Sequence, residues 1–177
     1  MVLIDRWIKQ VVIELGLCPF AYEVYAKKQI LFTSIDFLKA EAILNVLQNS
    51  ITHILSRETQ ETTALIIINS GLEKFEDYLL VYNSLEKLLP QLDQGSEIQL
   101  ASFHPDYSFV DTETDSVSNY TNRSPLPIIH LLRRADVTAA IASHPDINSV
   151  PTNNIQKLEQ LGLAGIREIM AGVTRLN

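Results

Sequence analysis

The sequence is short of cysteine and of positive charge, and each shortage excludes a class of protein. Cys18 is the only cysteine among 177 residues, so no intrachain disulfide is possible, and a reducing compartment suits the chain at least as well as an oxidising one. Lysine and arginine number 14 against 21 aspartates and glutamates, which gives a net charge of -7. We expect no nucleic-acid partner, because binding to a phosphate backbone requires a basic surface.

Long hydrophobic runs are also missing. No segment approaches the roughly 20 apolar residues that a helix needs to span a bilayer. The chain starts with MVLIDRWIKQVVIELG, in which Asp5, Arg6 and Lys9 interrupt the apolar residues too early for a signal peptide. We therefore expect a cytoplasmic protein without a membrane partner.

The residues that are present have the composition of an ordinary globular domain. Hydrophobic residues make up 46% of the chain and charged residues 20%, close to the average of folded soluble proteins. A chain of this length suits one domain, and no repeat, low-complexity tract or linker divides it. We predict a single domain covering residues 1–177.

Strand and helix patterns alternate along the first hundred residues. The run TALIIIN, residues 63–69, is apolar and β-branched, as in strands that are buried on both faces. Strands joined by helices through short connections form parallel pairs. The sequence therefore predicts an α/β fold, with a small three- to four-stranded, mainly parallel sheet, flanking helices and a helical C-terminal part. The expected strands are 29–33, 63–69 and 97–103. The first expected helix starts near the N-terminus and ends near Leu15. The others span 40–55, 70–89, 125–134, 136–143 and 153 to the end, with breaks at Gly162 and Gly172.

The expected helix over residues 125–134 would have two distinct faces. Ser124 is a good N-cap, and Pro125 suits the first helical position. A helical wheel places Ile128, Leu131, Leu132 and Ala135 on one side and His130, Arg133 and Arg134 on the other. We expect His130 and Arg133 to bind a ligand. The alternative is an ordinary solvated face.

His104 and Asp106 follow the third expected strand. Ligands of open parallel sheets bind at the carboxyl ends of the strands, where loops and helix N-termini converge. An imidazole held by a carboxylate can act as a general base, so His104 and Asp106 are candidate catalytic residues. The alternative is that both residues only cap the turn around Pro105.

The loop before residue 124 concentrates side chains that donate hydrogen bonds. Asn119, Tyr120, Asn122 and Arg123 occur within five positions, and arginine fits carboxylate and phosphate groups through two parallel hydrogen bonds. We expect these four residues to bind a small anionic metabolite. In the alternative, Arg123 staples the long loop to one of its own aspartates.

Cys18 lies in GLCPFA, after the first expected helix. A thiol near a histidine can act as a nucleophile, which makes Cys18 a third candidate catalytic residue. The alternative is a small buried hydrophobic residue, which the apolar neighbours Leu17 and Phe20 favour. No histidine, cysteine or aspartate spacing matches a recognised metal site, and we expect neither a metal nor a cofactor.

Four strings together resemble a known family: LGLCPFA, FHPDYSF, NYTNRSPLPIIHLLRRA and PTNNIQKLEQLG. Over nearly the whole chain the sequence is similar to the bacterial family catalogued as domain of unknown function 1415. The resemblance implies no activity, substrate or cofactor. It implies only that certain residues are motif positions of the family: Cys18, Pro19, His104, Pro105, Asn119, Asn122, Arg123, Pro125, His130 and Arg133.

These observations leave three functions open. The chain could be an enzyme that acts on a small phosphorylated or carboxylated metabolite, with His104 as base and Arg123 holding the anion. It could instead be a non-catalytic binding or sensor module for the same ligands. Third, it could be a structural or interaction protein whose polar motifs staple a long loop. The sequence does not decide whether the protein is an enzyme.

Overall fold

The computed structural model describes residues 2–144 and 146–175 and has the α/β class that the sequence predicts. The elements, in chain order, are α1 (Val2–Trp7), the π-helical η1 (Ile8–Ile13), α2 (Ala21–Ala26), β1 (Ile30–Asp36), α3 (Ala40–Leu55), β2 (Thr63–Ser70), α4 (Phe75–Leu88), η2 (Leu89–Gln91), η3 (Gly95–Glu97), β3 (Ile98–Phe103), η4 (Val117–Thr121), β4 (Ile128–Arg133), α5 (Arg134–Ser143), η5 (Ile147–Ser149) and α6 (Val150–Thr174).

The four strands form one mixed sheet in the order β1-β2-β4-β3. β1 and β2 are parallel, whereas β4 is antiparallel to both β2 and β3. β1, β2 and β3 therefore run in the same direction, as strands linked through helices should. The expectation of a mainly parallel sheet is wrong, because β4 lies between β2 and β3 and turns two of the three pairings antiparallel.

β4 occupies most of the segment for which the sequence predicts a helix, so the helical wheel over 125–134 is wrong. Proline disfavours helical backbone in the residue before it, so Pro125 and Pro127 oppose a helix at Ser124 and Leu126, and the chain bends at Pro125 and Leu126 before β4 begins. Ile129 and Leu131 face one side of the sheet and Ile128 the other, so β4 is apolar on both faces. A short apolar run of this kind has no period that separates a buried strand from a helix.

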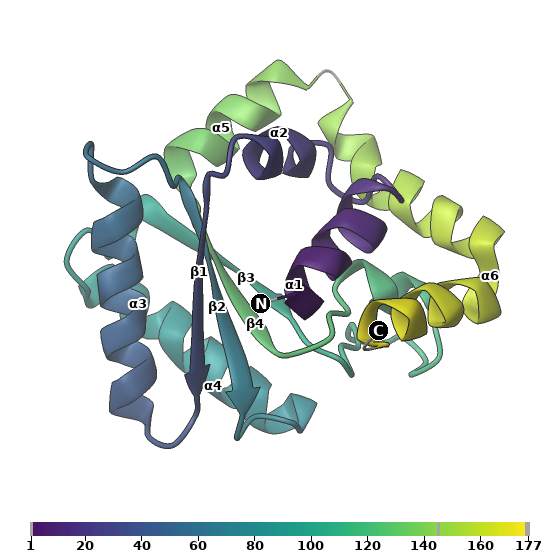
Figure 1. Cartoon of the computed structure of the whole chain (residues 1–177), viewed down its shortest axis with the longest axis horizontal. Coiled ribbons are helices and arrows are strands. Elements are labelled where there is room, and N and C mark those ends of the chain that lie inside the picture. The colour runs from purple at the N-terminus through teal and green to yellow at the C-terminus, as the bar shows by residue number, and fades with distance from the viewer. Residues whose placement is uncertain (1, 145, 176–177) are drawn as a thin grey trace.

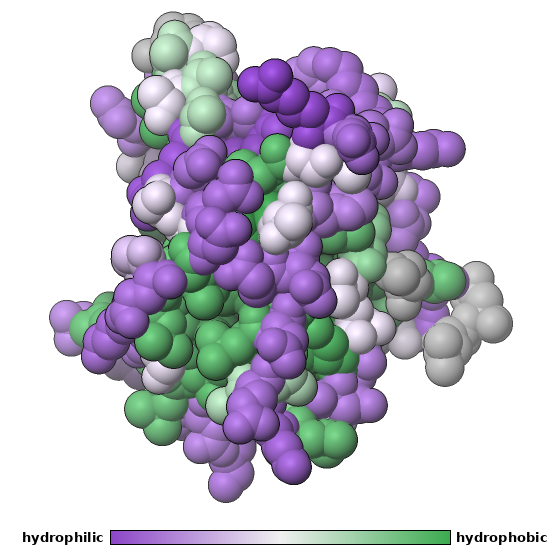
Figure 2. Space-filling model, turned by 90° about the vertical axis from the view of Figure 1, so that its left-hand side faces the viewer, coloured by the Kyte–Doolittle hydropathy of each residue, from purple (hydrophilic) through white to green (hydrophobic). Residues whose placement is uncertain are grey.

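Each face of the sheet supports its own hydrophobic core. α3 and α4 cover one face, and α1, η1 and α6 lie on the other (Figure 1). Side chains alternate along β2, so Ile66 belongs to the first core and Ile67 to the second. Figure 2 looks onto the α3 side, where apolar residues reach the surface between polar ones, and outer members of the first core such as Leu44 and Val81 are only half-buried.

The C-terminal part is helical, as expected, and the kink at Gly162 is confirmed. Gly162 has φ 73° and ψ 164° within α6, a conformation that residues with a side chain rarely adopt. Gly172 causes no break, because α6 continues to Thr174. Among the described residues, no helix combines the length and the apolar character needed to cross a membrane.

Candidate small-molecule pocket

Asn119 holds the long loop after β3 together. Its side chain is fully buried. Its Oδ1 accepts hydrogen bonds from the backbone N–H of Phe109 at 3.0 Å and from the hydroxyl of Thr112 at 2.9 Å. Its Nδ2 donates to the carbonyls of Glu113 at 3.0 Å and Thr114 at 3.3 Å. The amide thus uses its donors and acceptors on the loop itself.

Arg123 also acts as a staple. Its Nε donates to the carbonyl of Tyr107 at 3.2 Å and its Nη2 to the carbonyl of Thr114 at 2.7 Å. Its guanidinium carbon lies 4.6 Å from the centre of the Tyr120 ring, and its own carbonyl accepts a hydrogen bond from Nε1 of Trp7 at 3.1 Å. The guanidinium thus binds backbone carbonyls and the Tyr120 ring, and not the loop aspartates that the sequence suggested. The Trp7 ring binds the backbone of Arg123. Arg123 and Tyr120 therefore join the loop to the second core.

His104 lies among the aromatic residues of the first core and has no exposed surface. Its ring centre is 5.3 Å from that of Phe75 and 5.1 Å from that of Tyr78. Nε2 donates to the carbonyl of Leu72 at 3.1 Å, and Nδ1 accepts from the backbone N–H of Asp106 at 3.0 Å. Burial lowers the pKa of this imidazole below its usual value. Both nitrogens of a neutral ring are thus occupied.

His104 and Arg123 are neighbours in backbone but not in side chain. The N–H of His104 donates to the carbonyl of Asn122 at 3.2 Å, which ties the end of β3 to the loop. The imidazole contacts residues of the first core, whereas the guanidinium contacts loop carbonyls and Tyr120 of the second. Asp106 meets the imidazole through its backbone N–H and not through its carboxylate. The general-base role of His104 and the anion-binding role of Arg123 both stay predictions.

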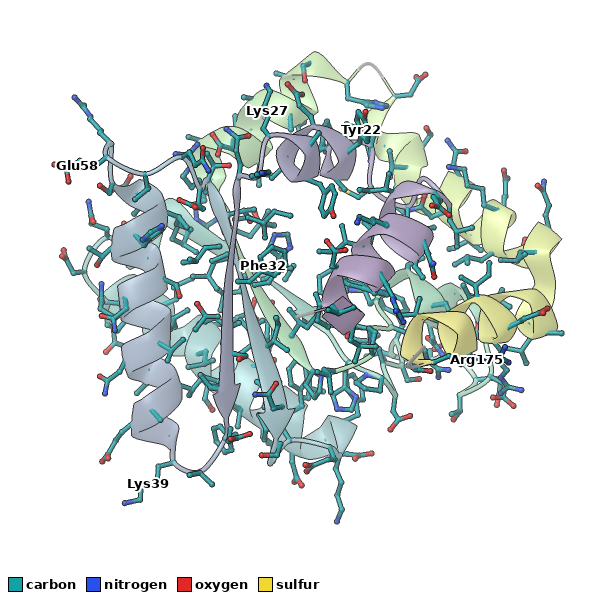
Figure 3. All side chains as sticks on the ribbon, in the orientation of Figure 1. Tyr22, Lys27, Phe32, Lys39, Glu58 and Arg175 are labelled. Carbon is teal, nitrogen blue, oxygen red and sulfur yellow. The ribbon has the colours of Figure 1, made fainter. Side chains whose placement is uncertain are left out.

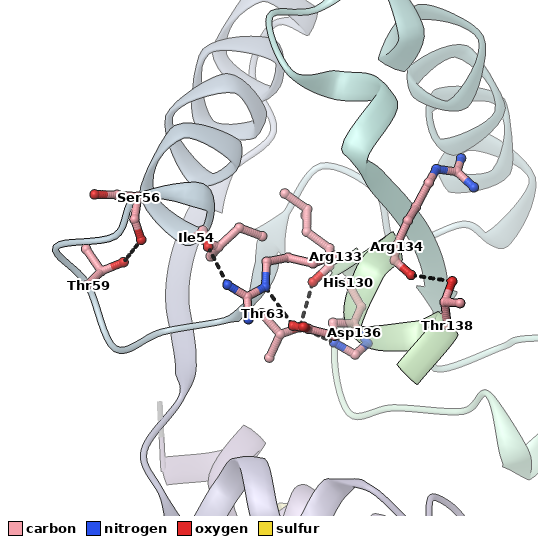
Figure 4. A network of polar contacts seen from close by, with 10 residues as sticks. Ile54, Ser56, Thr59, Thr63, His130, Arg133, Arg134, Asp136 and Thr138 are labelled. Carbon is pink, nitrogen blue, oxygen red and sulfur yellow. Dashed lines mark hydrogen bonds and ion pairs between the residues drawn. The ribbon is translucent and has the colours of Figure 1, made fainter. Parts of the chain in front are cut away.

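His130 and Arg133 point to opposite faces of β4 (Figure 4). The hydroxyl of Thr63 donates to the carbonyl of Leu131 at 2.6 Å and lies 2.7 Å from Nε2 of His130. A hydroxyl has one proton to donate, so in the second hydrogen bond Nε2–H of His130 is the donor and the Thr63 oxygen is the acceptor. Arg133 pairs with Asp136 at 2.6 Å. These residues thus have partners within the fold.

Burial lowers the pKa of His130 to about 4. The ring lies beneath the surface, although part of the residue remains accessible to solvent. The imidazole is therefore neutral at physiological pH and contributes no positive charge to an anion site.

Cys18 and Asn122 share the wall of a pocket of about 500 Å³ on the second-core side. The pocket is formed by η1, the turn after it, the end of β3, the long loop, η4 and the start of α6; its lining residues are Val12, Leu17, Cys18, Phe103, Phe109, Thr112, Ser118, Thr121, Asn122, Val150, Pro151, Asn154 and Ile155. Of the residues selected from the sequence, these are the two that the lining includes.

Short polar contacts fix the turn that carries Cys18. Gly16 has φ 61°, which lets the chain turn sharply after η1. Nδ2 of Asn154 donates to the carbonyl of Leu17 at 2.6 Å, and Nζ of Lys157 donates to the carbonyl of Gly16 at 3.0 Å. The start of α6 is thereby attached to this turn, and the two segments form adjacent walls of the pocket.

The polar groups of the pocket are mostly neutral and partly occupied. Asn122 donates from Nδ2 to the carbonyl of Ser102 at 3.1 Å, and its Oδ1 accepts from the hydroxyl of Thr121 at 3.0 Å. Burial raises the pKa of the Cys18 thiol, while the backbone N–H groups of Phe20 and Ala21 oppose this rise. The thiol is therefore less ionised at neutral pH than a free cysteine.

Sequence reasoning missed the hydroxyl groups of the pocket, those of Thr112, Ser118 and Thr121. The only available signal was the number of serines and threonines in the long loop, and that composition is equally typical of any exposed loop. In residues 2–144 and 146–175, no three His, Cys, Asp or Glu side chains gather closely enough to hold a metal ion.

Comparison with protein families matches residues 2–168 to one family model, described as Protein of unknown function (DUF1415). No curated protein and no solved structure matches the chain.

Proposed function

The chain belongs to the DUF1415 family, whose function is unknown, and we propose that it is a small-molecule-binding module whose ligand occupies the pocket between Cys18 and Asn122. The observation that carries the proposal is the pocket itself. Its volume of about 500 Å³ is typical of sites for small ligands. Several segments that are far apart in the sequence wall it, as is usual for a binding site built on loops around a rigid sheet.

The lining indicates the chemistry of the ligand. Aliphatic and aromatic side chains such as Val12, Phe103 and Ile155 form most of the wall. Thr121 and Asn122 add a hydroxyl and an amide, but none of the described lysines, arginines or histidines lines the pocket. A carboxylate or phosphate buried here would lose its hydration without gaining a cation. We therefore propose a neutral, largely apolar ligand with one polar end, in place of the anion expected from the sequence.

Binding is favoured over catalysis by the state of the candidate catalytic groups. An acid–base enzyme would need His104 to reach a substrate, yet both of its ring nitrogens are bonded and its side chain has no exposed surface. A thiol enzyme would need Cys18 as thiolate, and burial raises the pKa of that thiol. The pocket wall thus offers shape and hydrogen bonds but no activated group.

Thermal-shift screening of neutral small metabolites tests the proposal. A ligand present at 100 times its Kd stabilises a folded protein by about 2.7 kcal/mol, which is measurable as a rise in Tm. Ile155→Trp should fill the pocket and abolish the rise. Gln156→Trp places the same side chain on the neighbouring exposed position of α6 and should retain it.

Two results would contradict the proposal. One is a set of hits that bind Ile155→Trp as tightly as the parent, because the ligand would then lie elsewhere. The other is a hit that mass spectrometry shows to be chemically converted, which would make the protein an enzyme instead of a binding module.

A further inference from the structure

A second pocket, of about 250 Å³, lies on the first-core side of the sheet. It forms where the end of α4, the turns η2 and η3, the start of β3 and the start of α5 meet. Leu89, Pro90 and Leu100 supply apolar surface, and Glu86 and Arg134 add one charge of each sign. None of its lining residues lines the pocket around Cys18 and Asn122, so the two pockets are separate.

Gly95 fixes the shape of the pocket wall between η2 and η3. A Cβ at this position would lie 1.8 Å from the carbonyl oxygen of Leu89, so only glycine allows the two turns to approach so closely. The N–H of Gly95 also donates to the carbonyl of Leu92 at 3.0 Å. This wall is therefore held by the backbone and does not depend on the positions of exposed side chains.

Glu86 and Arg134 line the same pocket without binding each other. Oε1 of Glu86 accepts from the hydroxyl of Tyr82 at 3.0 Å, and its second oxygen accepts from none of the described residues. Arg133 pairs with Asp136, and the side chain of Arg134 points away from that pair (Figure 4). Within residues 2–144 and 146–175, no hydrogen bond or ion pair engages the guanidinium of Arg134. Both charges can therefore bind a ligand.

The setting of these two charges differs from that of an ordinary surface charge. Lys39 and Glu58, before and after α3, project into solvent from the outside of the molecule (Figure 3). Glu86 and Arg134 instead share one concave surface with apolar side chains. A concave wall of low polarity focuses the field of the charges that line it, so these two attract charged groups of a ligand more strongly.

The two charges select the class of ligand. A carboxylate fits the planar guanidinium of Arg134 through two parallel hydrogen bonds. An ammonium group can donate to the second oxygen of Glu86. A ligand with one kind of charge would be attracted by one of these side chains and repelled by the other. A zwitterion satisfies both, and its apolar part can lie against Leu89 and Leu100.

We propose that the second pocket binds a free amino acid with an apolar side chain, its carboxylate on Arg134 and its ammonium group on Glu86. The volume of about 250 Å³ lies just below the roughly 300–1,000 Å³ of sites for drug-sized ligands, which suits a molecule of this small size. This inference goes beyond the proposed function and does not rest on it, because it uses neither the other pocket nor its ligand.

NMR titration of the isotopically labelled full chain with the standard free amino acids, one at a time, tests the proposal. L-Leucine should shift the backbone amide resonances of Ser96 and Gln99, which line the pocket, with a dissociation constant in the millimolar range or tighter. Leucinamide lacks the carboxylate and N-acetylleucine lacks the ammonium group, so each should bind at least about tenfold more weakly than L-leucine.

Three results of this titration would overturn the proposal. The first is that no free amino acid shifts these resonances at millimolar concentrations. The second is binding that is confined to amino acids with charged side chains, because the apolar part of the pocket would then have no role. The third is equal binding of L-leucine, leucinamide and N-acetylleucine, because the two charges would then not select the ligand.

Two substitutions test the roles of the charged residues. Arg134→Gln and Glu86→Gln each remove one charge, and each should weaken the binding of L-leucine at least about tenfold. Both side chains are exposed, so the variants should fold like the parent. The matched controls are Arg57→Gln and Glu58→Gln, at exposed positions outside the pocket, which should bind like the parent. If the pocket variants bind L-leucine as tightly as their controls, the proposed arrangement is wrong.

Discussion

At the scale of single residues, the polar side chains of this protein mostly serve its own backbone. Asn119 and Arg123 bind carbonyls and N–H groups of the long loop, and His104 bridges Leu72 and Asp106. A loop carries many backbone groups that no helix or strand satisfies, and buried groups of this kind need partners. The density of donors around residues 119–123 meets that need.

Arg123→Ala should destabilise the fold. The substitution leaves the carbonyls of Tyr107 and Thr114 without this partner in a partly buried setting and removes the contact with the Tyr120 ring. We expect a loss on the order of 2–3 kcal/mol in the free energy of unfolding, as for other hydrogen bonds to charged groups. Urea unfolding measures this loss, with the exposed Arg57→Ala as control. Equal stability of the two variants would argue against the stapling role.

His130 should make stability depend on pH. Its pKa is about 4 in the folded protein and about 6.5 in the unfolded chain, so the unfolded chain binds the proton first. The contribution of the neutral ring to stability is fully present above the pKa of the unfolded chain and is lost as the pH falls from about 6.5 toward 4. Titration of this one group should lower the free energy of unfolding by about 2 kcal/mol between pH 7 and pH 5.

The control for this prediction is His130→Gln, whose amide can still donate to Thr63. Chemical unfolding at both pH values should show a smaller loss for the variant than for the parent. His104 remains in both proteins, so its own titration cancels. Identical losses would mean that His130 titrates normally in the fold.

At the scale of elements, α6 shows how one residue divides a helix. Its first turns wall the pocket and hold the turn at Gly16, while Ile166 and Val173, beyond the kink, pack into the second core. The change of direction at Gly162 allows one helix to meet both requirements.

Gly162→Ala should therefore cost stability despite open space around the new methyl group. A Cβ at this position meets no atom of the described residues within 4 Å, so the cost is conformational and should be on the order of 1–3 kcal/mol. Gly172→Ala is the matched control, because it also meets open space but lies in regular helix and should stabilise by roughly 0.5–1 kcal/mol. Thermal unfolding compares the two. Changes of the same sign would contradict the assignment of strain to Gly162.

At the scale of the whole molecule, one thin sheet separates two cores. β2 and β4 alternate their side chains between these cores, so neither core can form without the shared strands. The two halves should consequently unfold in a single cooperative transition.

Ile66→Ala tests this coupling. Ile66 is fully buried in the first core, and its truncation should cost roughly 2–5 kcal/mol. Trp7, the only tryptophan, lies in the second core and reports on that side alone. Its fluorescence midpoint in urea should shift together with the far-UV circular dichroism signal. A fluorescence transition that stays at the parent midpoint would mean that the cores unfold separately.

The sequence by itself determined the features that depend on local order. The continuous apolar run of β2, the stripe of α3 over residues 40–55 and the glycine that kinks α6 are each encoded within a few turns of chain. The common direction of β1, β2 and β3 follows from the helices that connect them.

Only the tertiary structure decided the features that depend on distant partners. Residues 128–133 became a strand because β2 and β3 both offer hydrogen bonds along their edges, and no pattern within those six residues encodes that choice. Likewise, a guanidinium such as that of Arg123 donates the same kind of hydrogen bond to a loop carbonyl as to an oxygen of a ligand. The residue type fixes the kind of bond, but only the folded chain fixes which acceptor lies within reach.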